Sequence, residues 1–160
     1  MENDQQDLGT KIKALQISHL AMMGGVLMFA AIPFILGGIG KPGEDFTLKA
    51  VICTTVFVVT SIASVLVPKT IIQQGVRKYS AGETFTTSNL FVLLQLTHII
   101  RLALQEASAL LGCVMFFASR DPVFLVFPGM FLILGFILFP TRSKLLAIIQ
   151  GMEEKIRQGL

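Results

Sequence analysis

Residues 48–67 decide the fold class: they read LKAVICTTVFVVTSIASVLV, and Lys49 is their only charged side chain. A helix needs about 20 apolar residues to cross roughly 30 Å of hydrocarbon, because each residue rises about 1.5 Å. Backbone amides in lipid must be satisfied within their own segment, which a helix achieves. Since the stretch is far longer than a buried strand of about eight residues, it predicts a membrane-spanning helix.

Three further apolar stretches, at about 17–38, 97–118 and 122–139, have the same character. The whole chain is 53% hydrophobic and 14% charged, whereas soluble domains carry about 25% charged residues. We therefore expect an all-α fold, a bundle of four transmembrane helices arranged as two hairpins. The four spans form a single membrane domain over residues 1–160.

Local features refine this layout. Residues 69–88 form the only long polar connection, and we expect the third span to extend backwards to about Ser88. Pro128 lies near the middle of the fourth span, where a proline predicts a kink. Residues 143–160 carry apolar side chains at helical spacing. They predict an amphipathic C-terminal helix that lies on the membrane or on a partner.

Basic residues are divided unequally between the two sides of this topology. One side carries nine lysines and arginines and the other carries three, which places both termini and the tail 143–160 in the cytoplasm. We expect a bacterial inner membrane. The net charge of +3 is scattered between apolar segments, so it does not predict nucleic-acid binding. The nine are Lys11, Lys13, Lys69, Arg77, Lys78, Arg142, Lys144, Lys155 and Arg157, and the three are Lys41, Lys49 and Arg120.

Small residues recur along one face of the first span. Because lipid gives no hydrophobic drive for helix association, such residues favour close contact between backbones. They predict a close-packed bundle, and with the bilayer as surroundings they also favour other membrane subunits or self-association as partners. The residues of this face are Ala14, Ser18, Ala21 and Gly25.

Glu106 is the residue with the strongest functional signal, because it lies about ten residues into the third span. An ionised carboxylate in the bilayer core is costly, so such acids are candidates for ion handling. Either it is protonated or a partner lies nearby. Arg101 lies five residues earlier and does not share its face. A structural glutamate inside the bundle is the simpler interpretation.

The same span carries a polar stripe. Its members are separated by three or four residues and therefore share one helix face. Contact between helices is the simplest explanation, and the lining of an ion path is the alternative. The stripe consists of His98, Arg101, Gln105, Ser108 and Gly112.

His19 and His98 lie near the same end of two odd-numbered spans. Two opposed histidines in a helical bundle can ligate a haem b. We expect no cofactor, and a haem b held by this pair is the alternative. The sequence contains no phosphate-binding loop, zinc-protease motif or catalytic triad pattern.

The stretch from Ala103 to Gly112 reads ALQEASALLG. It resembles the carboxylate helix of the rotor-ring proteolipid, subunit c, of rotary ATP synthases, which has the form A-L-x-E-A-x-A-L-x-G. The resemblance implies that Glu106 carries an ion. It covers about 20 of the 160 residues, and the overall layout resembles uncharacterised four-helix membrane proteins of bacteria.

Taken together, these patterns predict a multi-pass integral membrane protein without catalytic residues, serving as an accessory or scaffold subunit. The alternatives are an ion- or proton-translocating component that uses Glu106, with Gln105, Arg101 and Ser108 beside it, and a haem carrier. We favour a non-enzymatic role, because the sequence shows none of the catalytic motifs named above.

Overall fold

The protein is all-α in a computed structural model that describes every residue except 1, 36–45, 81–85 and 159–160. Residues 37–43 are rich in glycine, which predicts a flexible break between the first two spans, and they lie outside the described residues. The all-α prediction is confirmed, since no strand occurs in the described ranges. The elements are α1 (Glu2–Ile35), α2 (Phe46–Ser80), α3 (Thr87–Ser119), the 3₁₀ helix η1 (Pro122–Leu125), α4 (Val126–Ile137) and α5 (Arg142–Gln158).

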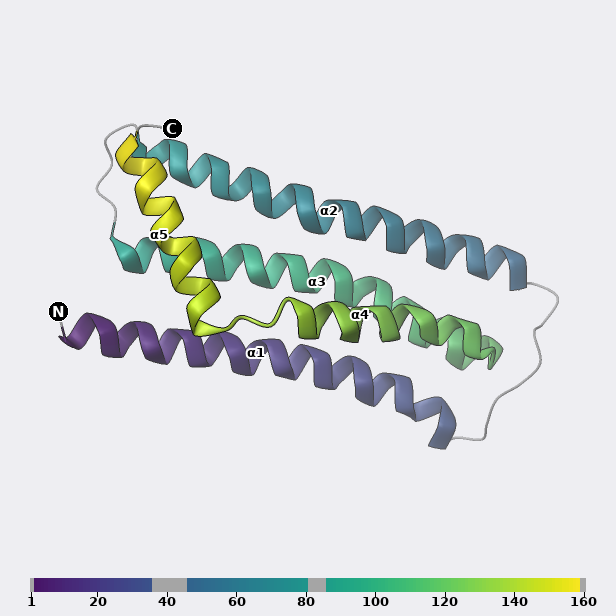
Figure 1. The fold of residues 1–160 in the computed structure, drawn as a ribbon. Coiled ribbons are helices and arrows are strands. Elements are labelled where there is room, and N and C mark those ends of the chain that lie inside the picture. Colours follow the sequence, from purple (N-terminus) through teal and green to yellow (C-terminus); the bar gives the residue numbers. More distant parts are fainter. Residues whose placement is uncertain (1, 36–45, 81–85, 159–160) are drawn as a thin grey trace.

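Helix α3 lies at the centre of the molecule (Figure 1). It contacts α1, α2, η1, α4 and α5, and α4 packs into the space beside α1 and α3. Helices α1 and α2 lie on opposite sides of α3. The arrangement therefore differs from two separate hairpins, because the first two helices of the chain pack on α3 instead of on each other.

Three helices are long and apolar enough to cross a membrane, over Leu8–Ile32, Phe46–Tyr79 and Thr87–Ser119. The number of possible spans rises to four if Pro122–Ile137 and Arg142–Gln158 are counted as one span, although the chain bends by 71° between them. Helices α1, α2 and α3 have 34, 35 and 33 residues. At 1.5 Å per residue each is about 50 Å long, more than the roughly 30 Å of hydrocarbon in a bilayer.

The polar connection predicted at 69–88 is helical over 69–80, because α2 continues through Pro68 to Ser80. Packing of Val76 in a hydrophobic cluster with Leu90 stabilises this extension. The predicted early start of the third span is confirmed. Thr86 caps α3 by accepting a hydrogen bond from the Asn89 amide at 3.2 Å.

The predicted kink at Pro128 is also misplaced. Residues 122–125 form a 3₁₀ helix and the α-helix begins at Val126, so Pro128 lies in the first turn of α4. A missing amide hydrogen costs little in a first turn. The sharp bend comes later, between Ile137 and Arg142, where the chain turns by 71° into α5.

Helix α5 crosses the end of the bundle that holds the start of α1 and the end of α2 (Figure 1). The amphipathic prediction holds, and the buried part of the apolar stripe packs on other helices of the chain, whereas Ile148 is 45% exposed. The contact creates a hydrophobic cluster, the basic-end cluster, with Leu8, Ile72 and Tyr79 around it. Its buried members are Ile12, Leu15, Val76, Leu90, Phe91, Leu94, Leu145, Ile149, Met152 and Ile156.

Beyond this cluster the surface changes character. Large apolar side chains face outward along 17–35, 48–67, 92–117 and 123–137, and Met28 is 72% exposed. We call this surface the apolar belt. Beneath it lie two smaller clusters, one built around Val26 and Phe131 and one around Phe116.

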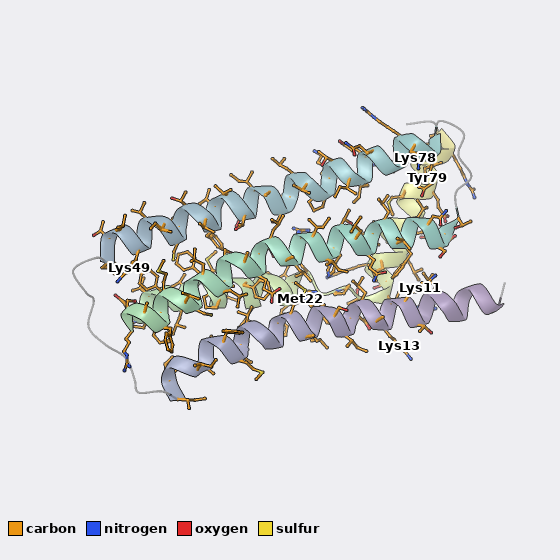
Figure 2. The ribbon with its side chains drawn as sticks, turned by 180° about the vertical axis from the view of Figure 1, so that it is seen from behind. Lys11, Lys13, Met22, Lys49, Lys78 and Tyr79 are labelled. Atoms are coloured by element: carbon orange, nitrogen blue, oxygen red, sulfur yellow. The ribbon has the colours of Figure 1, made fainter. Side chains whose placement is uncertain are left out.

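Lysines mark the two ends of the bundle (Figure 2). Lys11, Lys13 and Lys78 lie at the end that α5 crosses, and Lys49 lies at the opposite end. Helix α5, which carries four basic residues, runs toward this same end. We call this the basic end. The four lysines labelled in Figure 2 thus agree with the charge asymmetry counted in the sequence.

Candidate functional site

Two histidines from different helices are joined inside the bundle. The Nδ1 of His19 in α1 lies 3.0 Å from the Nε2 of His98 in α3, and the Nε2 of His19 lies 2.9 Å from the carbonyl oxygen of Gly135 in α4. A carbonyl only accepts, so His19 donates from Nε2. In a neutral pair His19 therefore accepts at Nδ1, and His98 donates from Nε2. The hydrogen bonds from His98 through His19 to Gly135 link three helices.

Packing holds this row of hydrogen-bonded groups in place. His19 is 1% exposed, its ring stacks on His98 with centroids 5.2 Å apart, and the edge of Phe139 lies against it. Gly135 allows α1 and α4 to approach closely. A Cβ at this position would lie 2.9 Å from the sulfur of Met23. The site depends on close contact between helices that are distant in sequence.

The histidine pair does not fit the haem alternative. A bis-histidine haem needs the two ligating nitrogens on opposite faces of a porphyrin, with the iron between them. Here a nitrogen of His19 lies at hydrogen-bond distance from a nitrogen of His98, and the rings are stacked. In the part of the chain that the structure describes, no group of three or more His, Cys, Asp or Glu residues could hold a metal ion.

Gln105 lies at the contact between α3 and α2. The Gln105 amide donates to the Ser64 hydroxyl at 3.3 Å, and Ser64 in turn donates to the carbonyl of Ser61. Ser108 is buried and donates within α3 to the carbonyl of Gln105 at 2.7 Å. Gly112 packs against η1 and α4, where a Cβ would lie 2.9 Å from the backbone oxygen of Phe124. Gln105 and Gly112 therefore mediate helix contacts, whereas the Ser108 hydroxyl is satisfied within its own helix.

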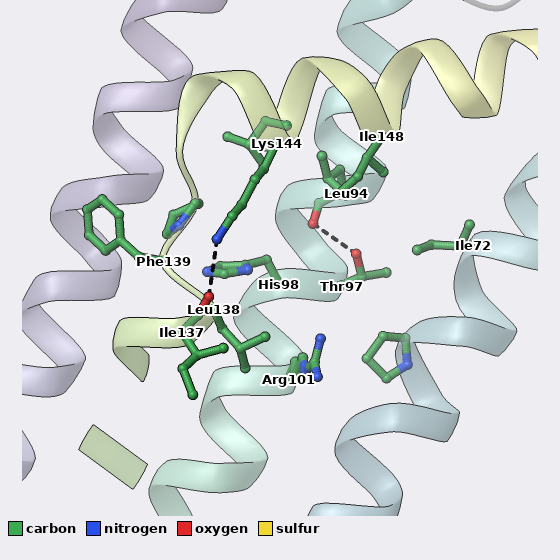
Figure 3. A pocket seen from close by; sticks show the side chains of 13 residues that line it. Ile72, Leu94, Thr97, His98, Arg101, Ile137, Leu138, Phe139, Lys144 and Ile148 are labelled. Atoms are coloured by element: carbon green, nitrogen blue, oxygen red, sulfur yellow. Dashed lines mark hydrogen bonds between the residues drawn. The ribbon is translucent and has the colours of Figure 1, made fainter. Parts of the chain in front are cut away.

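Arg101 points into a hollow between α2, α3 and the α4–α5 bend, as Figure 3 shows. The hollow has a volume of about 280 Å³. Lys144 reaches it from α5 and donates to the Ile137 carbonyl at 3.2 Å. His98 also lines it, whereas the Nε of Arg101 is buried and makes no hydrogen bond to the described residues.

Glu106 stands apart from the other candidates. It is half-buried in α3, and within the described ranges it has neither a hydrogen-bond partner nor an ion-pair partner. The structure thus joins His19 to His98 and Gln105 to Ser64, but it does not join Glu106 to Arg101. Gln105 and Ser108 are hydrogen-bonded, whereas the Glu106 carboxyl group has no polar contact within the described residues.

Three contributors were missed by the sequence analysis. Gly135 supplies a backbone carbonyl, which no side-chain pattern reports. Lys144 enters the hollow only because the chain bends by 71° before α5. Ser64 was seen only as a small residue, although it accepts from Gln105. In each case the signal lies in a contact between helices.

The small-residue face of α1 points away from its own bundle. Ala14, Ser18 and Ala21 are exposed. Nothing lies within 4 Å of a Cβ built on Gly25. The sequence predicted that this face would pack the bundle, but the inward face of α1 carries larger side chains such as Met23. The small face is left open along the apolar belt.

No protein-family model, curated protein or solved structure matches this chain. The functional argument therefore rests on the geometry of the chain itself.

Proposed function

We propose that this protein is a multi-pass integral membrane protein that acts as a non-enzymatic accessory or scaffold subunit. Four spans fit best, with η1 and α4 as a short fourth span before the bend. The excess of lysine and arginine at the basic end favours a cytoplasmic location for that end and for both termini. A bacterial inner membrane is the setting that we propose.

The open small-residue face of α1 carries this proposal. Ser18, Ala21 and Gly25 recur at steps of three and four residues, so they form one continuous stripe. Small residues let a second helix approach closely enough for dispersion contacts and Cα–H hydrogen bonds. Because the chain itself does not cover this stripe, it suits a helix from a second copy or another membrane subunit.

The test is to block the stripe with bulk. Ala21→Leu places a large side chain on the open face without touching the buried face of α1. We expect at least tenfold weaker association, equivalent to about 1.4 kcal/mol. The measurement is the mass of the complex and the list of co-purifying subunits in mild detergent.

Ala107→Leu is the matched control, since Ala107 is exposed on α3 away from the stripe. It should leave the complex intact. A wild-type protein that is monomeric and free of co-purifying subunits in native membranes would refute the scaffold role, as would equal effects of the two substitutions.

A second candidate, ion or proton translocation, is supported by the unpaired state of Glu106 in the described part of α3. An intramembrane carboxyl group without a protein partner is suited to bind a cation or a proton. The resemblance of this helix to the subunit c carboxylate helix supports the same residue. Ion flux in vesicles should be abolished by Glu106→Gln and retained in Gln105→Leu. Absence of flux in the wild-type protein refutes this candidate.

A further inference from the structure

We propose that the hollow around Arg101 and Lys144 binds the anionic phosphate headgroup of a membrane lipid. This inference goes beyond the scaffold role, and it rests on the proposed placement of the apolar belt in a bilayer.

The first argument is charge. Arg101 and Lys144 bring two cationic side chains into one hollow, and His98 adds a third nitrogen-bearing ring. None of the described residues that line it is acidic. A phosphate oxygen is a strong hydrogen-bond partner for a guanidinium or ammonium group, so this pair of cations favours an anionic headgroup.

The second argument is the level of the hollow along the bundle. Toward one end, Val65 and Leu66 of α2 and Ile137 of α4 face outward as part of the apolar belt. Toward the other end, Gln73 and Gln74 of α2 face outward. On α2 the hollow, which Pro68 and Ile72 line, thus lies where the apolar surface gives way to a polar one. This is the depth at which a bilayer places its phosphate groups.

The third argument is the shape of the lining. Apart from its basic groups the hollow is walled mainly by apolar side chains, including Ile72 and Ile148. These two residues also line a neighbouring hollow of about 490 Å³ between α2 and α5, where Arg77 and Lys155 add two further cations. Two neighbouring hollows with cations and apolar walls suit an amphiphile, because its headgroup and acyl chain find matching surfaces.

The experiment compares lipids on the purified full-length protein by native mass spectrometry in mild detergent. Phosphatidylglycerol should bind at least about tenfold more tightly than phosphatidylcholine, because both carry the phosphate but the choline cation of the second lipid is repelled by Arg101 and Lys144. Inorganic phosphate is added as a competitor. Failure of millimolar phosphate to displace the lipid identifies a lipid headgroup, whereas full displacement overturns the lipid assignment in favour of free phosphate.

Variants localise the site. Lys144→Gln and Arg101→Gln should each weaken phosphatidylglycerol binding about tenfold, and Arg101→Lys should restore part of it. Lys144 is exposed at the start of α5, so its substitution keeps the test valid if an Arg101 variant fails to fold. Lys13→Gln is the control, because Lys13 is exposed at the basic end outside the hollow.

Two results would overturn the inference. One is equal binding of phosphatidylglycerol and phosphatidylcholine, and the other is an equal loss of binding in Lys13→Gln and Lys144→Gln, which would indicate a diffuse basic surface. Neither result affects the scaffold role, since the masses of complexes in the same spectra report association through α1 separately.

Discussion

The basic end and the apolar belt of this bundle are built on opposite plans. At the basic end ten apolar side chains are buried beneath exposed polar residues such as Gln73 and Arg77. In the belt the outward surface is apolar, whereas His19, Gln105 and Ser108 are among the buried side chains. The first plan suits water and the second suits lipid, because each surface matches its solvent. The same helices therefore carry a surface suited to water at the basic end and a surface suited to lipid along the apolar belt.

The largest effect should come from emptying the basic-end cluster. Phe91 is 0% exposed and packs with residues of α1, α2 and α5. We expect Phe91→Ala to lower the free energy of unfolding by about 3–5 kcal/mol, since it leaves a cavity. Chemical denaturation in detergent micelles measures this change.

Val92→Ala is its control, since Val92 is 55% exposed and should cost far less. If the two substitutions proved equally mild, the end that α5 crosses would not behave as a packed core.

The next effect separates the two surfaces directly. Val59 is 59% exposed in the belt, and Gln74 is exposed nearer the basic end of the same helix. Val59→Lys should disfavour membrane insertion by about 2.5–3.5 kcal/mol, because it places a charge in hydrocarbon. Gln74→Lys should change it by less than about 0.5 kcal/mol. An insertion assay in microsomes compares them, and equal insertion would show that the belt does not meet lipid.

A smaller effect distinguishes the inward and outward glycines of the belt. A Cβ on Gly112 would lie 2.8 Å from Cβ of Phe127, whereas nothing lies within 4 Å of a Cβ on Gly25. Gly112→Ala should cost about 1–3 kcal/mol through overpacking. Gly25→Ala should instead stabilise α1 by about 0.5–1 kcal/mol. Thermal unfolding in detergent gives both values, and the same sign for both would contradict the assigned helix faces.

The smallest effect concerns the polar interior. Gln105 makes one long hydrogen bond to Ser64, and its Oε1 is buried without a partner among the described residues. Gln105→Leu removes that unsatisfied oxygen, while Ser64 keeps its bond to Ser61. We expect a change below about 1 kcal/mol in unfolding free energy. A loss of several kcal/mol would show that this pair holds α2 and α3 together.

The helices could be predicted from the sequence. Which face of each helix is buried was harder to predict. At the basic end, the buried apolar side chains of α5 recur every three or four residues, so their burial follows from periodicity; they are Leu145, Ile149, Met152 and Ile156. In the belt this signal disappears. Met23 is buried and Met28 is 72% exposed, although both are methionines of one helix, because lipid accepts the same side chains as a protein core.

The same reason explains the outcome for the candidate site. The sequence placed His19 and His98 at similar depth, and the structure joins them at 3.0 Å. It did not predict that the Gly135 carbonyl completes the chain or that Lys144 joins Arg101 at the hollow. Backbone groups and a bend between helices leave no pattern in side-chain types.

The sequence by itself determined that this chain is helical, that at least three of its helices are long and apolar enough to span a bilayer, and that its basic residues gather at one end. These properties follow from the local composition of each segment, so they can be predicted without knowing which helices pack together. Only the tertiary structure decided that α3 is the central helix, that α5 packs on its own bundle, and that α1 leaves its small-residue face open. Those facts depend on which helix surfaces fit one another. Because these helices are apolar on most sides, hydropathy does not distinguish the surfaces that pack inside the bundle from those that face outward.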